Sequence, residues 1–117
     1  MRNPEFIYKV TSREVFDASM TAGRFLGMPV DHADGYLHFS TAAQLRETLR
    51  LYFAGQSDLV LFALKAPDLG AELRWEPSRG GQLFPHLFGD LPMPAVTDSA
   101  TISVAADGNV ELPDWVK

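Results

Sequence analysis

The fold of this chain is decided by one stretch, VDHADGYLHFST at residues 30–41, which holds two of the chain's three histidines. Residues 33–35 (ADG) have turn chemistry, because aspartate can hydrogen-bond the backbone two residues on and glycine adopts positive φ without steric cost. Residues 36–40 alternate as a strand does, so Leu37 and Phe39 are expected to face the core. The side chains expected on the opposite face, towards a cleft or solvent, are those of Tyr36, His38 and Ser40.

A helix is expected directly after this strand. Thr41 and Gln44 match a capping box, and apolar residues then recur at helical spacing up to about Ala54. His38 would therefore lie beside a helix N-terminus, whose partial positive charge and free N–H groups suit an anionic ligand. An ordinary solvated strand face followed by a cap explains the same residues, and the sequence leaves both interpretations open.

The composition is that of one globular domain spanning residues 1–117, with 46% hydrophobic and 21% charged residues. The absence of cysteine excludes disulfides, thiolate zinc sites and a cysteine nucleophile. We find no apolar run that could span a membrane and no apolar core of a signal peptide, so we expect a cytoplasmic protein without a membrane partner. A net charge of -5 argues against broad nucleic-acid binding but is compatible with a local pocket for one phosphate or nucleotide.

The residues before this stretch predict a strand at 6–10 and a helix that starts in a capping box at Thr11 and ends at Gly23. Residues 24–31 are expected to form an irregular or strand-like link, because Gly27 and Pro29 prevent a long regular element.

The residues after it predict mostly strands. Residues 59–64 are apolar on both faces, as in a central strand covered on both sides. We expect turns at 66–70 and 107–108, a loop at 77–82, and a rigid apolar segment at 83–92 that is not assigned to a strand. Further strands are expected at 72–76 and within 94–104, followed by an extended tail that packs back on the domain. Early helices and later strands favour an α+β fold with a mostly antiparallel or mixed sheet.

Histidine is the side chain best suited to acid–base chemistry near neutral pH, so His38 and His86 are the leading candidates, with Glu76. Each has a simpler interpretation: His86 could be a core histidine, and Glu76 could pair with Arg74 or Arg79 on the surface. No local histidine spacing supports a metal site, so we expect none. No Gly-x-Ser-x-Gly elbow supports a serine hydrolase.

Three motifs in order along the chain resemble those of a small bacterial family known only as domain of unknown function 952. They are IYKV at residues 7–10, DGYLHFS at residues 34–40, and WE at 75–76 followed by FPHLFG at 84–89. The fold of that family is thought to be similar to that of the ADP-ribosyltransferases and the RNA 2'-phosphotransferases, which bind NAD in a cleft of a split β-sheet. The resemblance therefore implies a single α+β domain with a split mixed or antiparallel sheet and two main helices, and NAD as the candidate cofactor.

The resemblance also implies roles for individual residues. Residues 36–40 match the strand of the phosphotransferases that carries a His-x-His-like motif, with Tyr36 at the first histidine's position. Glu76 corresponds to the late glutamate that holds a ribose hydroxyl in the transferases. Tyr8 and Lys9 stand where their first strand offers a histidine or arginine to the nucleotide. Arginine suits bidentate phosphate contact, so Arg74, Arg79 or Lys9 would hold the pyrophosphate, and Tyr36 or Phe88 would stack on the nicotinamide.

The sequence and the resemblance together predict an enzyme, or a degenerate enzyme, of ADP-ribosyltransferase-like fold. Its catalytic groups would be His38, Glu76 and His86. Its ligand-binding groups would be Tyr8, Lys9, His32, Asp34, Tyr36, Ser40, Arg74 and Arg79. The alternatives are a non-catalytic module that binds a nucleotide or another small anion in the same cleft, and a fold in which the histidines are structural.

Overall fold

The structure is a computed structural model that describes residues 4–117. Its strands form two three-stranded sheets, and every strand pair is antiparallel. The first sheet has the order β1 (Phe6–Ser12), β3 (Leu59–Lys65), β6 (Val96–Ile102). The second has the order β2 (Leu37–His38), β5 (Leu83–Leu87), β4 (Leu73–Pro77). The expected α+β class with antiparallel sheets is confirmed.

One residue pair bridges the two sheets. The backbone N–H of Tyr8 donates to the carbonyl of Ser40 at 2.8 Å, and the N–H of Ser40 donates to the carbonyl of Tyr8 at 2.9 Å. On either side of this bridge the sheets part, so the edge of β1 borders an opening between them.

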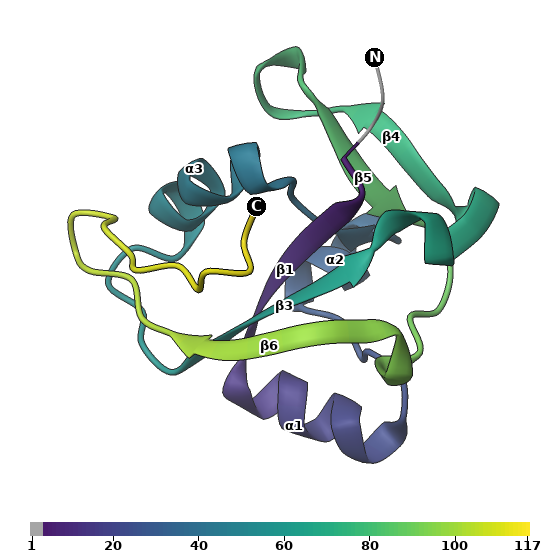
Figure 1. Ribbon diagram of the computed structural model, residues 1–117, viewed down its shortest axis with the longest axis horizontal. Helices are drawn as coiled ribbons and strands as arrows, with labels where there is room; N and C mark the ends of the chain where they lie inside the picture. The colour runs from purple at the N-terminus through teal and green to yellow at the C-terminus, as the bar shows by residue number, and fades with distance from the viewer. Residues whose placement is uncertain (1–3) are drawn as a thin grey trace.

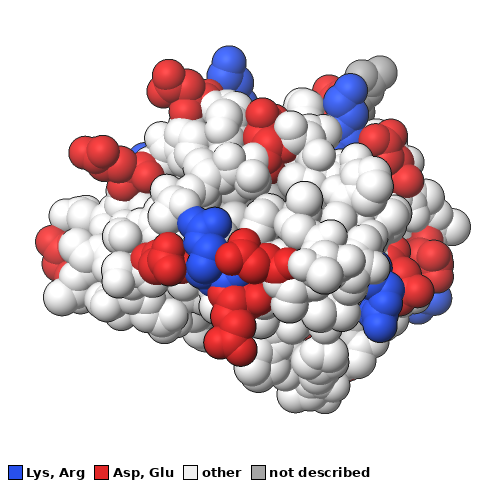
Figure 2. Space-filling model, turned by 90° about the horizontal axis from the view of Figure 1, so that it is seen from below, with Lys and Arg blue, Asp and Glu red and all other residues white. Residues whose placement is uncertain are grey.

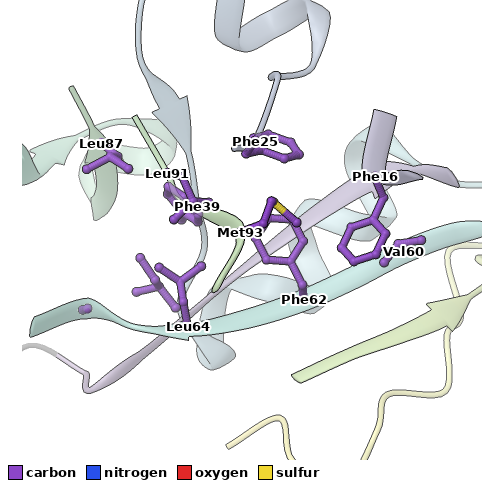
Figure 3. Close-up of a cluster of buried hydrophobic side chains, with 11 residues drawn as sticks. Phe16, Phe25, Phe39, Val60, Phe62, Leu64, Leu87, Leu91 and Met93 are labelled. Atoms are coloured by element: carbon purple, nitrogen blue, oxygen red, sulfur yellow. The ribbon is translucent and has the colours of Figure 1, made fainter. Parts of the chain in front are cut away.

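The central strand β3 is buried on both faces, as its apolar sequence predicts. One face contacts helix α1 (Arg13–Ala22) and the second sheet; the other contacts helix α3 (Ala42–Tyr52) and the C-terminal segment, and in Figure 1 the two helices lie on opposite sides of the strands. Figure 3 shows the first of these cores, where Phe62 and Leu64 of β3 meet side chains from the rest of the chain. Those side chains include Phe16, Phe25, Phe39, Leu87, Leu91 and Met93.

The helix caps follow local sequence chemistry. In α3 the expected capping box is present, because Gln44 N–H donates to Thr41 Oγ1 at 3.3 Å and Thr41 N–H donates to Gln44 Oε1 at 3.1 Å. The helix ends at Tyr52, two residues earlier than expected. In α1 the N-cap is Ser12, whose Oγ accepts from Val15 N–H at 3.2 Å. The expected N-cap at Thr11 is wrong, since β1 extends through Ser12 and buries the Thr11 side chain completely.

A short helix, α2 (Pro29–Asp34), lies where an irregular link was expected. Proline is favourable at the first helical position, and the Asp31 carboxylate accepts the N–H of the N-cap residue Met28 at 2.7 Å. Gly35, with a φ of 83°, ends the helix in the left-handed conformation. Asp34 therefore belongs to the last turn of a helix and not to a free turn.

Strand β5 is also absent from the sequence expectations, because Pro85 lies in its middle and proline is rare inside sheets. The carbonyl of Pro85 accepts from Phe39 N–H at 3.1 Å, so the missing N–H of Pro85 also faces the β2 side. There the ladder has only two residue pairs, and the pairing of β5 with β4 is unaffected. The strand expected at 36–40 is correspondingly short, being a ladder only at Leu37 and His38.

The remaining connections are compact. Short 3₁₀ turns occupy Ala66–Glu72, Arg79–Gly81 and Met93–Ala95. The turn at residues 107–108 is present, although it joins irregular segments and not two strands. No helix of the described residues 4–117 is both long and apolar enough to cross a bilayer.

The C-terminal segment packs back on the domain as expected. Trp115 stacks on Tyr8 with ring centroids 6.4 Å apart, and the Tyr8 hydroxyl donates to a main-chain oxygen of Lys117 at 3.1 Å and accepts from its N–H at 3.0 Å. Because Tyr8 is almost completely buried, these bonds tie the tail to β1.

We expect Tyr8→Phe to lower the free energy of unfolding by about 1–2 kcal/mol, because the buried hydroxyl bonds the tail in both directions. Urea denaturation monitored by tryptophan fluorescence would measure the change. The matched control is Tyr52→Phe, whose side chain is 62% exposed and which should shift stability by less than about 0.5 kcal/mol. Equal effects of the two substitutions would contradict the assigned role of the Tyr8 hydroxyl.

Candidate functional site

The second sheet presents two chemically different faces. Its register sets His38 opposite His86 and Arg74 opposite His86, so these side chains emerge from the same face. The odd-numbered side chains Leu37, Leu73 and Leu87 pack with the first core. The predicted alternation around His38 is therefore confirmed, and the face that the core does not use carries the histidines.

The carboxylate of Asp31 is the hub of the site and is 3% exposed. Its Oδ1 accepts from Lys9 Nζ at 3.0 Å, from His38 N–H at 2.9 Å and from the His38 ring Nδ1 at 2.8 Å. Its Oδ2 accepts from Met28 N–H, as described above. Lys9 Nζ also donates to the carbonyl of His38 at 2.7 Å. One carboxylate thus fixes β1, α2 and β2 relative to one another.

These contacts determine the charges of the hub. Burial alone would raise the pKa of Asp31, but the hydrogen bond from His38 and the charge of Lys9 outweigh it and lower that pKa to about 2. Burial lowers the pKa of Lys9, and the charge and hydrogen bond of Asp31 oppose that shift. Because an ionised carboxylate only accepts hydrogen bonds, the Nδ1 of His38 carries a proton.

Two histidine–carboxylate pairs lie side by side. His38 Nε2 is 2.8 Å from Asp34 Oδ2, and His86 Nδ1 is 2.8 Å from Glu76 Oε1. The two imidazole centroids are 5.4 Å apart. The ring of Tyr36 packs against both, with centroids 4.6 Å from His38 and 4.3 Å from His86. Burial, followed by the charges of Asp34 and Glu76, raises the pKa of Tyr36, so its phenol stays protonated.

A cavity of about 460 Å³ opens beside these pairs, at the edge of β1 where the sheets part. Helix α2 and helix α3 both contribute lining residues, and the loop after β4 contributes Ser78 and Arg79. The polar side chains of its lining are Tyr8, Lys9, Asp34, His38, Ser40, Thr48, Tyr52, Ser78, Arg79 and His86. The residues of α3 that line the cavity lie along the side of the helix and not at its N-terminus. Thr41 and Gln44 cap that N-terminus, so the expected anion site at the N-terminus of this helix is not present.

Arg79 is the lining cation that no carboxylate pairs with among the described residues. Its guanidinium lies over the ring of Phe84 at 5.0 Å and over that of Tyr52 at 6.0 Å. It also donates to Thr48 Oγ1 at 3.3 Å, which is itself 3.0 Å from Ser40 Oγ. The guanidinium is thus held by packing, with donors left for an anion.

The predicted site residues divide between the cavity and its surroundings. His38, His86, Lys9, Asp34, Ser40, Tyr8 and Arg79 line the cavity. The lining does not include Glu76 or Tyr36, although both contact the histidines. It does not include Arg74 either, whose guanidinium lies over the ring of Phe88 at 4.7 Å. His32 is exposed on α2, outside the lining. Of the lining groups, Tyr8 and Lys9 are already engaged by the tail and by Asp31.

Sequence reasoning missed Asp31 and Thr48. Recognition of α2 from Pro29, with an aspartate two residues later in its first turn, would have drawn attention to Asp31. Thr48 carried no comparable signal. Within residues 4–117 no group of three or more histidine, cysteine, aspartate or glutamate side chains is arranged to hold a metal ion.

Comparison with known proteins gives relatives without an assigned activity. The family model described as "Protein of unknown function (DUF952)" matches residues 10–99. The crystal structure of protein CC0527 from Caulobacter crescentus is 46% identical, with a TM-score of 0.86 over 91% of this chain and 93% of that chain. The solution NMR structure of CC0527 is 48% identical, with a TM-score of 0.78 over 90% of each chain. No curated protein matches.

We expect the Asp31 hub to make the fold sensitive to acid. The pKa of Asp31 is lower in the folded state than the 3.8 of an ordinary aspartate, so its stabilisation is complete above about pH 4 and is lost as the pH falls towards 2. The loss should be about 2 kcal/mol. Thermal unfolding of the wild type and of Asp31→Asn across this range would measure it, with the exposed Asp68→Asn as the control.

Asp31→Asn should also destabilise the protein at neutral pH by about 3–5 kcal/mol, because it leaves Lys9 charged and buried. The double variant Lys9→Met/Asp31→Asn removes both charges and should recover part of that loss. Additive effects of the two substitutions, or an acid profile of Asp31→Asn that matches the wild type, would contradict the role given to this pair.

Proposed function

We propose, from the premise that this chain belongs to the DUF952 family, that it is an enzyme that binds a phosphate-bearing nucleotide-type ligand in the cleft between its two sheets. The observation that carries the proposal is that His38, His86 and Arg79 line one cavity. An arginine suited to phosphate and two histidines held by carboxylates are what acid–base-assisted group transfer requires.

Arg79 supports an anionic ligand. Its guanidinium is unpaired by any carboxylate of the described residues and is flanked by the hydroxyls of Thr48 and Ser40. The basic character is local: the chain has a net charge of -5, and on the face seen in Figure 2 basic side chains are scattered among acidic ones. A single bound phosphate group fits this distribution better than an extended nucleic acid.

The apolar part of the lining supports a ligand that also carries a ring. Val30 and Tyr52 line the cavity and are 53% and 62% exposed, so their side chains are accessible to a ligand. Met28 and Phe84 line it as well. A nucleobase could stack on Tyr52 while its phosphate reaches Arg79, because the Arg79 guanidinium already lies over the Tyr52 ring.

A second candidate reaction is ADP-ribosyl transfer from NAD, which the split sheet and the position of the cavity favour. Such transfer passes through an oxocarbenium-like state that a carboxylate stabilises. Glu76 was the expected carboxylate, but it contacts His86 and is not part of the lining. Asp34 is the one acidic side chain among the lining residues, so it is the group that would face the ribose in this reaction.

We expect AMP, ADP-ribose or NAD to give measurable heats of binding in isothermal titration. Arg79→Gln should weaken binding about 10- to 100-fold, which is the loss of a charge-assisted hydrogen bond of roughly 1.5–3 kcal/mol. Arg24→Gln, at an exposed position outside the cavity, is the control. Blank titrations with all three ligands, together with a melting temperature that falls sharply in His38→Ala, would instead favour purely structural histidines.

If NAD is the donor, the wild type should release nicotinamide and Asp34→Asn should release it about 100-fold more slowly. Chromatography of the reaction mixture measures both. Binding of NAD without nicotinamide release over several hours would remove glycosyl transfer and leave nucleotide binding in place.

A further inference from the structure

We propose that His38 and His86 act as the general acid and the general base in hydrolysis of a nucleotide phosphodiester. The proposal rests on the proposed nucleotide site and assigns its reaction and substrate class. His38 would protonate the leaving oxygen, and His86 would deprotonate the attacking water.

His38 is held as the acid by carboxylates on both ring nitrogens. Its Nδ1 is 2.8 Å from Asp31 Oδ1 and its Nε2 is 2.8 Å from Asp34 Oδ2. Because carboxylates accept hydrogen bonds and do not donate them, each ring nitrogen of His38 is placed to donate a proton. Lys9, the nearest cation, is directed to Asp31 and to the His38 carbonyl, not to the ring. The Nε2 proton is directed at Asp34, which lines the cavity, so the leaving oxygen would have to displace the half-exposed Asp34 carboxylate to receive that proton.

His86 is held as the base by one carboxylate only. Its Nδ1 donates to Glu76 Oε1, which selects the tautomer whose Nε2 has a free lone pair. Nε2 has no hydrogen-bond partner among the described residues, yet no buried side-chain nitrogen or oxygen among them lacks one. Nε2 therefore keeps a small accessible area, although His86 as a whole is only 3% exposed, and His86 lines the cavity. Arg74, its partner across the strands, packs on Phe88.

The two imidazoles are in edge contact, so the reacting phosphate would lie in the cavity that both of them line and not between the rings. Their centroids are 5.4 Å apart at an interplanar angle of 66°, and Tyr36 packs against both rings and fixes that separation. Arg79 lines the same cavity and would hold the non-bridging oxygens of the phosphate. Asp34 and Glu76 are positioning residues, since they act through the imidazoles.

The step uses only water and the diester. His86 Nε2 takes a proton from water as the water oxygen forms a bond to phosphorus. The bond from phosphorus to the leaving oxygen breaks, and that oxygen takes the Nε2 proton of His38. The products are a phosphomonoester and an alcohol. Transfer of the proton from His86 to solvent, and from solvent to His38, restores the resting enzyme.

Two esters of AMP that differ only in the leaving group separate the roles. The methyl ester leaves as an alkoxide and needs a proton, whereas the 4-nitrophenyl ester leaves as a stable anion and does not. We expect His86→Ala to slow hydrolysis of both esters about 100-fold or more. We expect His38→Asn to slow the methyl ester about 100-fold or more and the nitrophenyl ester less than about 10-fold. Asparagine keeps a donor near the Nδ1 position for Asp31, so the hub is preserved.

A matched histidine completes the test. His32→Ala, an exposed histidine outside the cavity, should leave both rates unchanged. Equal losses on the two esters in His38→Asn would overturn the proposal. Binding of AMP without hydrolysis of either ester would overturn it and leave the nucleotide site standing, whereas failure of AMP to bind would remove both.

Discussion

The structure depends on one buried carboxylate. Asp31 accepts hydrogen bonds from the Lys9 ammonium, from the backbone and ring of His38, and from the backbone of Met28. Burying Lys9 alone would cost several kcal/mol, and so would burying Asp31 alone; only the pair with its further donors makes either tolerable. The same contacts fix the rotamer of His38 and keep a proton on its Nδ1. Folding and the preparation of the candidate site are therefore one process in this protein.

The second sheet explains why the site lies where it does. Its odd-numbered side chains pack in the first core, so its even-numbered face does not pack on the first sheet. Helices α2 and α3 flank that face without filling it, and the cavity is the space between them. The aromatic ring of Tyr36 packs against both histidines, so each imidazole is held by carboxylate hydrogen bonds and by an aromatic contact.

Much of this arrangement could be predicted from local sequence, and the exceptions have physical causes. Alternation placed His38 away from the core, and the apolar run at 59–64 identified the central strand, because both signals depend on side-chain period alone. Strand β5 escaped prediction because the tolerance of Pro85 depends on how short β2 is, which is a tertiary fact. Glu76 was expected in the cavity but contacts His86 instead, for the same reason. That contact follows from the register of β4 and β5, which the spacing of the two residues along the sequence does not reveal. Asp31 was missed because helix α2 was missed.

The single bridge between Tyr8 and Ser40 has a mechanical consequence. Each sheet is a ladder of its own, and in the described residues the bridge shares the task of joining β1 to β2 with Lys9, which contacts Asp31 and the carbonyl of His38. These contacts lie on neighbouring residues beside the cavity, so they hold the two sheets at a fixed angle there. His38 lies in the second sheet and Arg79 in the turn that joins its strands β4 and β5, so the distance between the proton-transferring and the anion-binding group is set within one sheet and does not depend on that angle.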